Sequence, residues 1–272
     1  MDEIRNQINK FKYTLINNFN DLDLANFYSN LSTLKVILST DEVYGKLDFY
    51  TNGYYDFKHN KIIINKNKMD EDVFFHELFH LASNSFMKNV KTNNVSVGFY
   101  QYNGNKNWGL GLNEGYTELL ARRFFIKKNI LYNYDFEVDV SRYLESILGK
   151  DKMVSYYLRG NLSMLIDELS KIVYKNDVLR FISNIDYVYY HIYNVDDYNK
   201  VIKIIEKINI FLISLKIKKF LDRYDLNYLI ENKDKILKVN YNKEYLNKLN
   251  IMQDEDFFNY IFSKFKNKSN MR

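Results

Sequence analysis

The chain has 272 residues, of which 46% are hydrophobic and 27% are charged, and its formal net charge is +5 at pH 7. These values are ordinary for a folded globular protein. They exclude a wholly disordered chain, a collagen-like fibre and a disulfide-rich miniprotein. Cysteine is absent, so disulfides and thiolate-bound metal sites are excluded as well.

Two segments bear on where the protein is located. The N-terminal residues Met1 to Asn6 carry acidic groups early and no apolar run, so we expect no secretory signal peptide. The most apolar stretch, Ile208 to Ile217, is about half as long as a transmembrane helix. We therefore expect a cytoplasmic protein with no membrane-spanning segment.

Hydrophobic spacing predicts the first elements of the chain. Apolar residues three and four positions apart predict helical structure from residue 4 to about residue 38. Two β-prone runs, residues 54–58 and 61–65, flank a polar dipeptide and predict a β-hairpin. A helix is expected from Asp70 to Asn84, because acidic residues in its first turn offset the helix dipole.

A second hairpin and another helix are predicted next. Residues 95–102 and 106–112 flank Asn103-Gly104, which is a strong turn signal. Asn113 is expected to cap a helix that runs to about Lys128, with basic residues in its last turns.

Beyond residue 130 glycine nearly vanishes and the apolar spacing is helical in almost every segment. The sequence therefore predicts an α+β fold that is predominantly helical. A small mixed sheet is expected beside the helix at residues 70–84, and a helical subdomain is expected in the C-terminal half.

Two of the four histidines lie in the pentapeptide His76-Glu77-Leu78-Phe79-His80. Residues at positions i and i+4 project from one face of a helix, so both imidazoles can reach a single ion. Imidazole nitrogen binds zinc at about 2.0–2.1 Å, and a helix presents two such ligands rigidly. Glu77 would lie beside the remaining coordination position, where it can take a proton from metal-bound water. The pentapeptide therefore predicts a metal site.

An acidic motif follows in the next predicted helix. Glu114 and Glu118 are again four residues apart, and two like charges on one helical face repel in water. A divalent cation held by Glu114, His76 and His80 would reverse the sign of that interaction. Glu118 could then accept a hydrogen bond from a ligating imidazole and fix its tautomer. The alternative is an acidic first turn on an exposed helix, without a metal.

The HExxH pentapeptide followed by Asn-Glu-x-x-Thr-Glu resembles the paired motifs of the gluzincin class of zinc metallopeptidases. Thermolysin-like enzymes of that class carry Asn-Glu-x-x-Ser-Asp as the second motif. The resemblance implies one zinc ion and places residues of this chain around it. The implied ligands are His76, His80 and Glu114, the implied general base is Glu77, and the implied supporting residues are Glu118 and Asn113.

The resemblance covers about a quarter of the chain. The stretch from Asn60 to Arg123 is similar to poorly characterised predicted metallopeptidases of low-GC bacteria and their mobile elements. The 33 residues between His80 and Glu114 exceed the spacing in thermolysin-like enzymes. An inserted hairpin would account for the additional length.

Further predictions concern the residues around a substrate. An extended peptide can add to the exposed edge of a sheet, and we expect that edge in the first strand of the hairpin before the metal-binding helix. The substrate-binding residues predicted there are Tyr54, Tyr55, Asp56, Phe57 and Lys58. The three consecutive isoleucines at residues 62–64 are expected in a strand buried on both faces. His191 is a candidate catalytic residue that would donate to the oxyanion, and its alternative role is structural.

These patterns predict a zinc-dependent metallopeptidase that cleaves a peptide or protein substrate through metal-bound water activated by Glu77. Residues 1–129 would form the catalytic half, and residues 130–272 would form the other wall of the cleft. One alternative is a catalytically silent protein that binds a metal or a partner.

Another alternative is a helical nucleic-acid-binding module that uses the basic C-terminal segment. From Val201 to Arg272 the chain has 15 Lys or Arg against 9 Asp or Glu. These charges alternate with apolar residues, as on the outer face of packed helices. We therefore do not expect nucleic acid as a partner.

Overall fold

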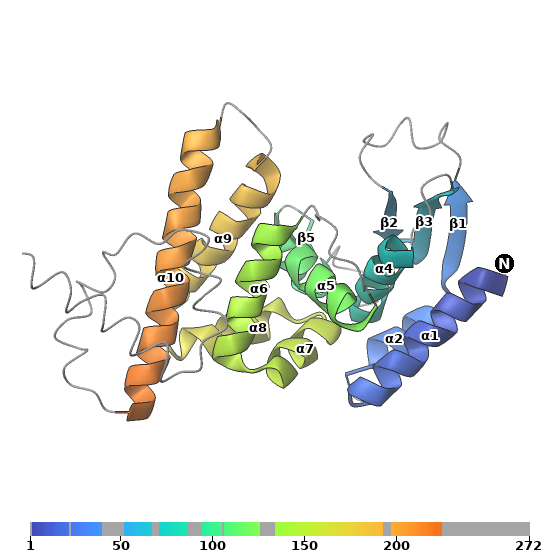
Figure 1. Ribbon diagram of the computed structural model, residues 1–272, viewed down its shortest axis with the longest axis horizontal. Helices are drawn as coiled ribbons and strands as arrows, with labels where there is room; N and C mark the ends of the chain where they lie inside the picture. The colour runs from blue at the N-terminus through green and yellow to red at the C-terminus, as the bar shows by residue number, and fades with distance from the viewer. Residues whose placement is uncertain are drawn as a thin grey trace, which may run out of the picture. The chain divides into compact units, whose positions relative to one another are not determined.

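The computed structural model describes residues 2–21, 23–39, 52–66, 71–85, 94–104, 106–125, 134–192 and 197–224 (Figure 1). This part of the chain is mainly helical and contains two small three-stranded sheets, which confirms the predicted α+β class. The helices are α1 (Asp2–Asn18), α2 (Ala25–Leu31), α4 (Glu71–Ser83), α5 (Leu110–Phe124), α6 (Asp135–Leu148), α7 (Lys150–Leu158), α8 (Leu162–Ser170), α9 (Lys175–His191) and α10 (Tyr198–Tyr224). The strands are β1 (Lys35–Ser39), β2 (Gly53–Asp56), β3 (Lys61–Asn65), β4 (Asn94–Val97), β5 (Tyr100–Asn103) and β6 (Asn107–Trp108).

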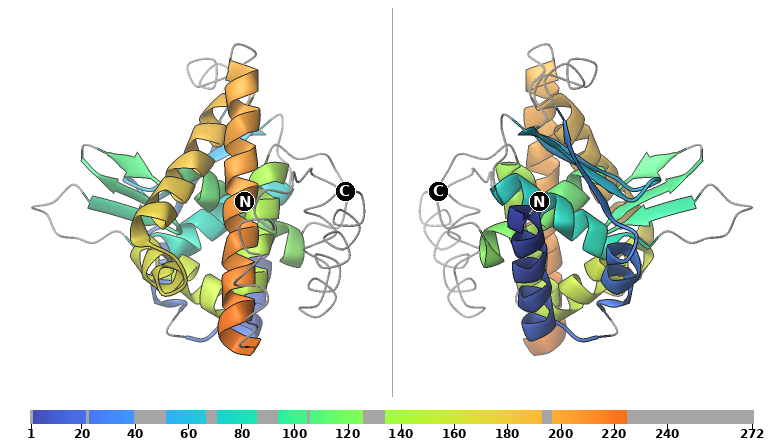
Figure 2. Two further views of the ribbon diagram at one scale, coloured as in Figure 1. Left: turned by 90° about the vertical axis from the view of Figure 1, so that its left-hand side faces the viewer. Right: turned by 90° about the vertical axis from the view of Figure 1, so that its right-hand side faces the viewer.

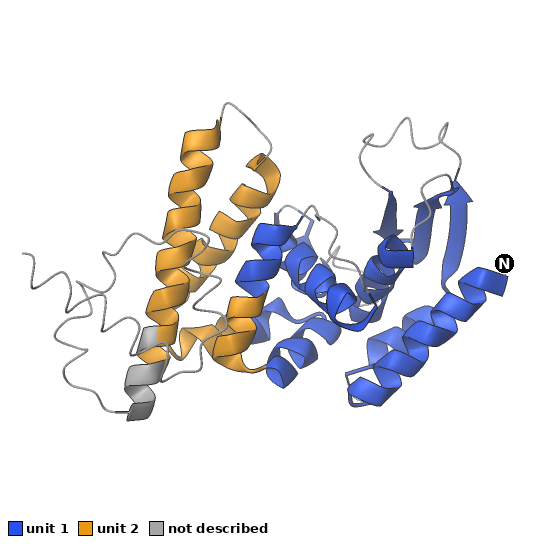
Figure 3. Ribbon diagram, in the orientation of Figure 1, with its two compact units in different colours: residues 1–141, 150–165 blue, residues 142–149, 166–272 orange. Residues whose placement is uncertain are grey.

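The chain divides into two compact units (Figure 3). The first unit comprises Met1–Ser141 and Lys150–Leu165, and the second comprises Arg142–Gly149 and Ile166–Arg272. The first unit contains both sheets and helices α1, α2, α4, α5 and α7, whereas α9 and α10 belong to the second. The division into a catalytic half at residues 1–129 and a second cleft wall at 130–272 stays a prediction.

The first sheet has the strand order β1-β3-β2, and its strands are drawn in blue tones in Figure 2. Strand β3 pairs antiparallel with β2, which confirms the predicted hairpin, and parallel with β1. Ile62 and Ile64 in the central strand are fully buried, whereas Ile63 is half-buried. Among the described strands, β2 forms one edge of this sheet, as expected.

The prediction of helix up to residue 38 is wrong at its C-terminal end. Residues 35–39 form β1, in which Lys35 lies opposite Lys61 and Ser39 lies opposite Asn65. The Val-Ile-Leu run suits a strand because branched side chains pack well on a pleated surface. Pairing with β3 satisfies backbone groups of β1, and the local sequence could not show that this partner was within reach.

The second sheet, β4-β5-β6, corrects the prediction for residues 95–112. The expected strand at 95–102 is two strands, because the chain turns at Gly98 with φ of +54°. A Cβ at Gly98 would lie 2.3 Å from Asn113 Oδ1, so glycine is required by space as well as by φ. The turn at Asn103-Gly104 does join β5 and β6 as predicted.

Helix α5 begins at Leu110, three residues before the predicted cap, and takes up the last three residues of the expected strand at 106–112, of which residues 107 and 108 form β6. Gly109 occupies the N-cap position with φ of +79°. Asn113 therefore lies inside the helix, and the prediction that it caps the helix is wrong. The side chain of Asn113 is free to make tertiary contacts, which are described below.

A buried aromatic cluster fixes α4 against its neighbours. The ring of Phe75 stacks on Phe125 at a centroid distance of 4.1 Å, and Phe11 of α1 lies edge-on to Phe79 at 4.9 Å. Helix α4 also packs against α2, α5, β2, β3 and β4. Every residue of α4 from Phe74 to Ser83 is buried, including both histidines and Glu77. Polar side chains on so buried a helix require partners.

The described helices of the second unit confirm the predicted helical C-terminal half. Helices α9 and α10 pack against each other, and Phe181 stacks on Phe211 at a centroid distance of 4.3 Å. Among the helices of the described residues, none has both the length and the apolar character that crossing a bilayer requires. Most of the basic C-terminal segment, residues 225–272, lies outside the described residues.

Candidate metal centre

Helix α4 presents His76 and His80 on one face, as the i, i+4 spacing predicted. Each histidine is only 7% exposed. Their Nε2 atoms lie 3.1 Å apart, and the two rings are nearly perpendicular, with centroids 4.9 Å apart. The two lone-pair nitrogens can therefore face one point in space.

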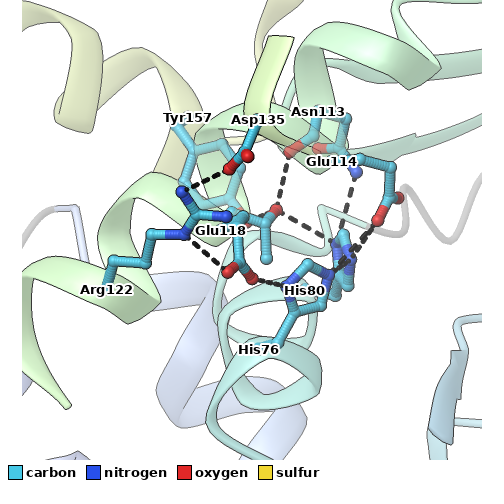
Figure 4. Close-up of polar contacts among 9 residues, drawn as sticks. His76, His80, Asn113, Glu114, Glu118, Arg122, Asp135 and Tyr157 are labelled. Carbon is cyan, nitrogen blue, oxygen red and sulfur yellow. Dashed lines mark hydrogen bonds and ion pairs between the residues drawn. The ribbon is translucent and has the colours of Figure 1, made fainter. Parts of the chain in front are cut away.

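Helix α5 brings the carboxylate of Glu114 to that point (Figure 4). Glu114 Oε2 lies 3.2 Å from Nε2 of His76 and 3.4 Å from Nε2 of His80. This confirms the predicted convergence of His76, His80 and Glu114, which form a group that could hold a metal ion.

The donor triangle fits a tetrahedral ion. Donor atoms bound to zinc at about 2.0–2.1 Å in tetrahedral geometry are separated by about 3.3–3.4 Å. The three separations here are 3.1, 3.2 and 3.4 Å. Two imidazoles and one carboxylate are also a donor set that zinc accepts, with its fourth position left for water or substrate.

The other nitrogen of His76 faces a chain of charged groups. His76 Nδ1 lies 3.0 Å from Glu118 Oε2, which is the contact that the sequence predicted for Glu118. Arg122 donates from Nε to Glu118 Oε1 at 2.8 Å and from a terminal nitrogen to Asp135 at 3.1 Å. The ring of Tyr134 stacks against His76 at 5.8 Å. The orientation of the His76 ring is thus fixed from two sides.

The other nitrogen of His80 faces neutral groups. Asn113 Nδ2 lies 3.2 Å from His80 Nδ1, and the Thr117 hydroxyl lies 3.4 Å from the same nitrogen. Asn113 Oδ1 accepts a hydrogen bond from the backbone N–H of Phe99 at 3.0 Å. Tyr157 of α7 reaches Thr117 with an oxygen–oxygen distance of 2.6 Å.

The charges at the triangle stabilise one another. Burial alone would lower the pKa of His76, but hydrogen bonds to Glu114 and Glu118 raise it to about 10. Burial would raise the pKa of Glu114, but the imidazoles of His80 and His76 hold it well below its usual range. The pKa of Glu118 is lowered against burial by His76 and Arg122. Both carboxylates are therefore anionic, and Glu114 faces the cation-binding position while Glu118 faces the opposite nitrogen of His76.

Glu77 lies next to this group in a different environment. Its side chain is on the buried helix α4, and the residue is 7% exposed. Burial raises the pKa of Glu77, although the nearby His76 and His80 and a hydrogen bond from the backbone N–H of Tyr55 oppose the shift. The carboxylate is thus a stronger base than a solvated one, and it lies within electrostatic reach of both histidines.

The predicted substrate strand lies beside Glu77. Strand β2 contains Tyr54, Tyr55 and Asp56, while Phe57 and Lys58 lie in the turn that follows. Asp56 accepts hydrogen bonds from the backbone of that turn. The structure thus brings the N–H of Tyr55 to the site, and binding of a substrate by this strand stays a prediction.

His191 lies in the second unit, at the end of α9. Its ring stacks on Tyr187 at 4.0 Å and its Nδ1 lies 2.8 Å from the Tyr187 carbonyl oxygen. Nε2 of His191 lies 3.8 Å from Asp197. All of these contacts are within its own unit, and the catalytic role of His191 stays a prediction.

Four residues that contact the ligands or their partners were assigned no role from the sequence. They are Thr117, Arg122, Tyr134 and Tyr157. Thr117 and Arg122 could have been found from their i+4 spacing to Asn113 and Glu118 on one helix. Tyr157 and Tyr134 come from distant segments, and nothing local distinguishes them among 25 tyrosines.

No protein-family model, curated protein or solved structure matches the chain. The function proposed next therefore depends on the geometry and chemistry of the chain's own residues.

Proposed function

We propose that the protein is a zinc-dependent metallopeptidase that hydrolyses peptide bonds. The observation that carries the proposal is the convergence of His76, His80 and Glu114 on one point. The basic Glu77 carboxylate lies within electrostatic reach of all three. A site that only braced the two helices would not need a buried carboxylate of raised pKa beside the ligands. Peptide or protein substrates and a cytoplasmic location stay predictions from the sequence.

The chemical roles of the metal ion and of Glu77 follow from their positions. Bound by the triangle, a zinc ion would supply Lewis-acid chemistry, by lowering the pKa of a water that it holds and polarising a peptide carbonyl. Glu77 takes a proton from the attacking water and passes it to the leaving amine. Its raised pKa brings it closer to neutral pH, where proton transfer in both directions is efficient.

The remaining residues hold the reacting groups in place. Glu118 keeps the His76 ring oriented through Nδ1, so that Nε2 faces the shared point. The backbone N–H of Tyr55 holds the Glu77 carboxylate and thereby ties β2 to the base. An extended peptide that pairs with the edge of β2 would therefore lie beside Glu77.

The metal is tested first. Native mass spectrometry and elemental analysis of the purified protein should find about one zinc ion per chain. Variants His80→Ala and Glu114→Ala should lose it, because each removes one donor of the triangle. A wild-type protein that binds no divalent metal would reject the proposal.

Peptide-bond hydrolysis is tested by replacing the proposed general base, Glu77. A peptide library incubated with the zinc-loaded protein and analysed by mass spectrometry should show cleavage. The Glu77→Gln variant should keep its zinc and lose at least about 100-fold in rate. Glu71→Gln is the matched control, because Glu71 lies on the same helix but is exposed, and its contact in the described part of the chain is with the exposed Lys10. If the protein binds zinc but cleaves no peptide, and Glu77→Gln and Glu71→Gln do not differ, the protein is a catalytically silent metal-binding protein instead.

A further inference from the structure

The two histidines of the triangle are held by chemically different groups. His76 Nδ1 faces the Glu118 carboxylate at 3.0 Å. The contacts of His80 Nδ1 in the described part of the chain are Asn113 Nδ2 at 3.2 Å and Thr117 Oγ1 at 3.4 Å. A carboxylate can only accept, so it keeps the proton of His76 on Nδ1. The tautomer of His80 depends on which of its two neutral neighbours, Asn113 or Thr117, makes the hydrogen bond with Nδ1.

Asn113 favours the tautomer that cannot bind a metal. Its Oδ1 accepts the N–H of Phe99 at 3.0 Å, so the amide nitrogen points to His80. An amide nitrogen can only donate, and it therefore requires a bare Nδ1. The proton of a neutral His80 ring would then be on Nε2, which is the atom that faces the triangle.

Thr117 favours the opposite tautomer. Its hydroxyl lies 2.7 Å from the backbone carbonyl oxygen of Asn113 and donates there, since a carbonyl can only accept. The lone pairs of the Thr117 oxygen are then available to two donors. One is the Tyr157 phenol, at 2.6 Å, and the other is Nδ1–H of His80. With the proton on Nδ1, the Nε2 lone pair faces Glu114 and His76 and can bind an ion.

Tyr157 fixes the position of the threonine. A threonine on a helix divides between two rotamers, and only an oxygen held toward His80 can accept from its ring. The short contact with the Tyr157 hydroxyl holds the Thr117 oxygen in place. Tyr157 is itself fully buried and packed against Phe99 and Tyr116. Burial raises the pKa of its phenol, so the group keeps its proton.

We infer that Thr117 and Tyr157 are positioning residues for the metal ligand His80, acting as a pair that keeps its proton on Nδ1 and its Nε2 free for the metal. The inference rests on the proposed metal site. It joins the motif residue Thr117 to Tyr157, a residue of α7 outside both sequence motifs, and together they select the metal-binding form of one ligand.

The test measures zinc affinity by competition with a chelating dye. Thr117→Val keeps the shape of the side chain but removes the hydroxyl oxygen that accepts from His80. Tyr157→Phe removes the hydroxyl that holds this oxygen in place. Each variant should lose about 10-fold or more in zinc affinity, as is typical when a partner of a ligating histidine is removed. Thr117→Ser keeps the oxygen and should restore affinity to within about threefold of wild type.

Tyr116→Phe is the matched control, since it removes a hydroxyl from the same buried aromatic cluster, 5.2 Å from the Tyr157 ring centre to centre. It should bind zinc as the wild type does. Thermal unfolding of every variant without metal shows whether the fold is intact. Nitrogen-15 spectra of the metal-free protein, with His80 assigned by its substitution, should show the proton of His80 moving toward Nε2 in Tyr157→Phe and Thr117→Val.

The outcomes separate this inference from the proposed function. If wild type binds zinc and both Thr117→Val and Tyr157→Phe bind it equally well, the pair does not position His80 and only this inference fails. If wild type binds no zinc, the metal site fails and the inference fails with it. If affinity falls in Tyr116→Phe as much as in Tyr157→Phe, the effect belongs to the aromatic packing, and the inference is again rejected.

Discussion

Zinc binding should release a proton from His76. In the structure both ring nitrogens face carboxylate oxygens, Nε2 toward Glu114 at 3.2 Å and Nδ1 toward Glu118 at 3.0 Å. Each contact favours an N–H, so the metal-free ring is an imidazolium with a pKa of about 10. A metal can occupy Nε2 only after that nitrogen loses its proton. Nδ1 keeps its proton and its bond to Glu118.

The size of the effect follows from the raised pKa. With a pKa of about 10, about one molecule in a thousand carries a neutral His76 ring at pH 7. The apparent zinc affinity should therefore rise about tenfold for each pH unit, or about 100-fold from pH 6 to pH 8. About one proton should be released from His76 per zinc bound at pH 7. Glu114 releases none, because its pKa is already well below the usual range.

Isothermal titration calorimetry in two buffers with different ionisation heats counts the released protons directly. Competition with a chelating dye at several pH values gives the slope of affinity against pH. Glu118→Gln is the control, because it keeps an acceptor for Nδ1–H but removes a charge that raises the pKa of His76. In that variant the pKa of His76 is lower, so the pH at which zinc affinity stops rising should be lower than in the wild type. If the zinc affinity of both wild type and Glu118→Gln is independent of pH, the reasoning is refuted.

Three further predictions concern stability, all measured by denaturant or thermal unfolding. Gly115→Ala should destabilise the fold by about 1–3 kcal/mol, because its Cβ would lie 2.4 Å from the carbonyl group of Glu137; a change below about 0.5 kcal/mol would contradict this close approach. Phe75→Ala should cost about 3–5 kcal/mol, since the ring is fully buried and stacked on Phe125. Without metal, the free energy of unfolding should fall as pH rises from 6.5 toward 10, because in this range the folded state keeps a proton on His76 that the unfolded state has lost. If the free energy of unfolding of the metal-free protein rises with pH over this range, other titrating groups outweigh His76.

Local sequence predicted some elements well. Residues 71–83 are helical as expected, since acidic residues open the segment and apolar residues fill it. The hairpin of β2 and β3 was also predicted, because two β-prone runs flank a short polar turn. In both cases neighbouring residues supply the stabilising interactions, so the pattern and the structure agree.

Two of the failed predictions have different causes. Residues 35–39 are a strand because β3 pairs with them from about 26 positions further along the chain. Asn113 does not cap α5, because Gly109 begins the helix earlier and Phe99 takes up the asparagine oxygen. The strand depends on a partner distant in sequence, which a propensity does not count, whereas the start of the helix depends on Gly109, a nearby glycine whose role as N-cap the prediction missed.

For the candidate metal centre, the sequence by itself determined which side chains share a helical face. The i, i+4 spacing places His76 with His80 and Glu114 with Glu118, because 3.6 residues complete one helical turn. Only the tertiary structure decided that the two helices bring their faces together, with donor atoms 3.1–3.4 Å apart. It alone brought Tyr157 to the partners of His80, because packing between segments distant in sequence is set by the shape of the buried core.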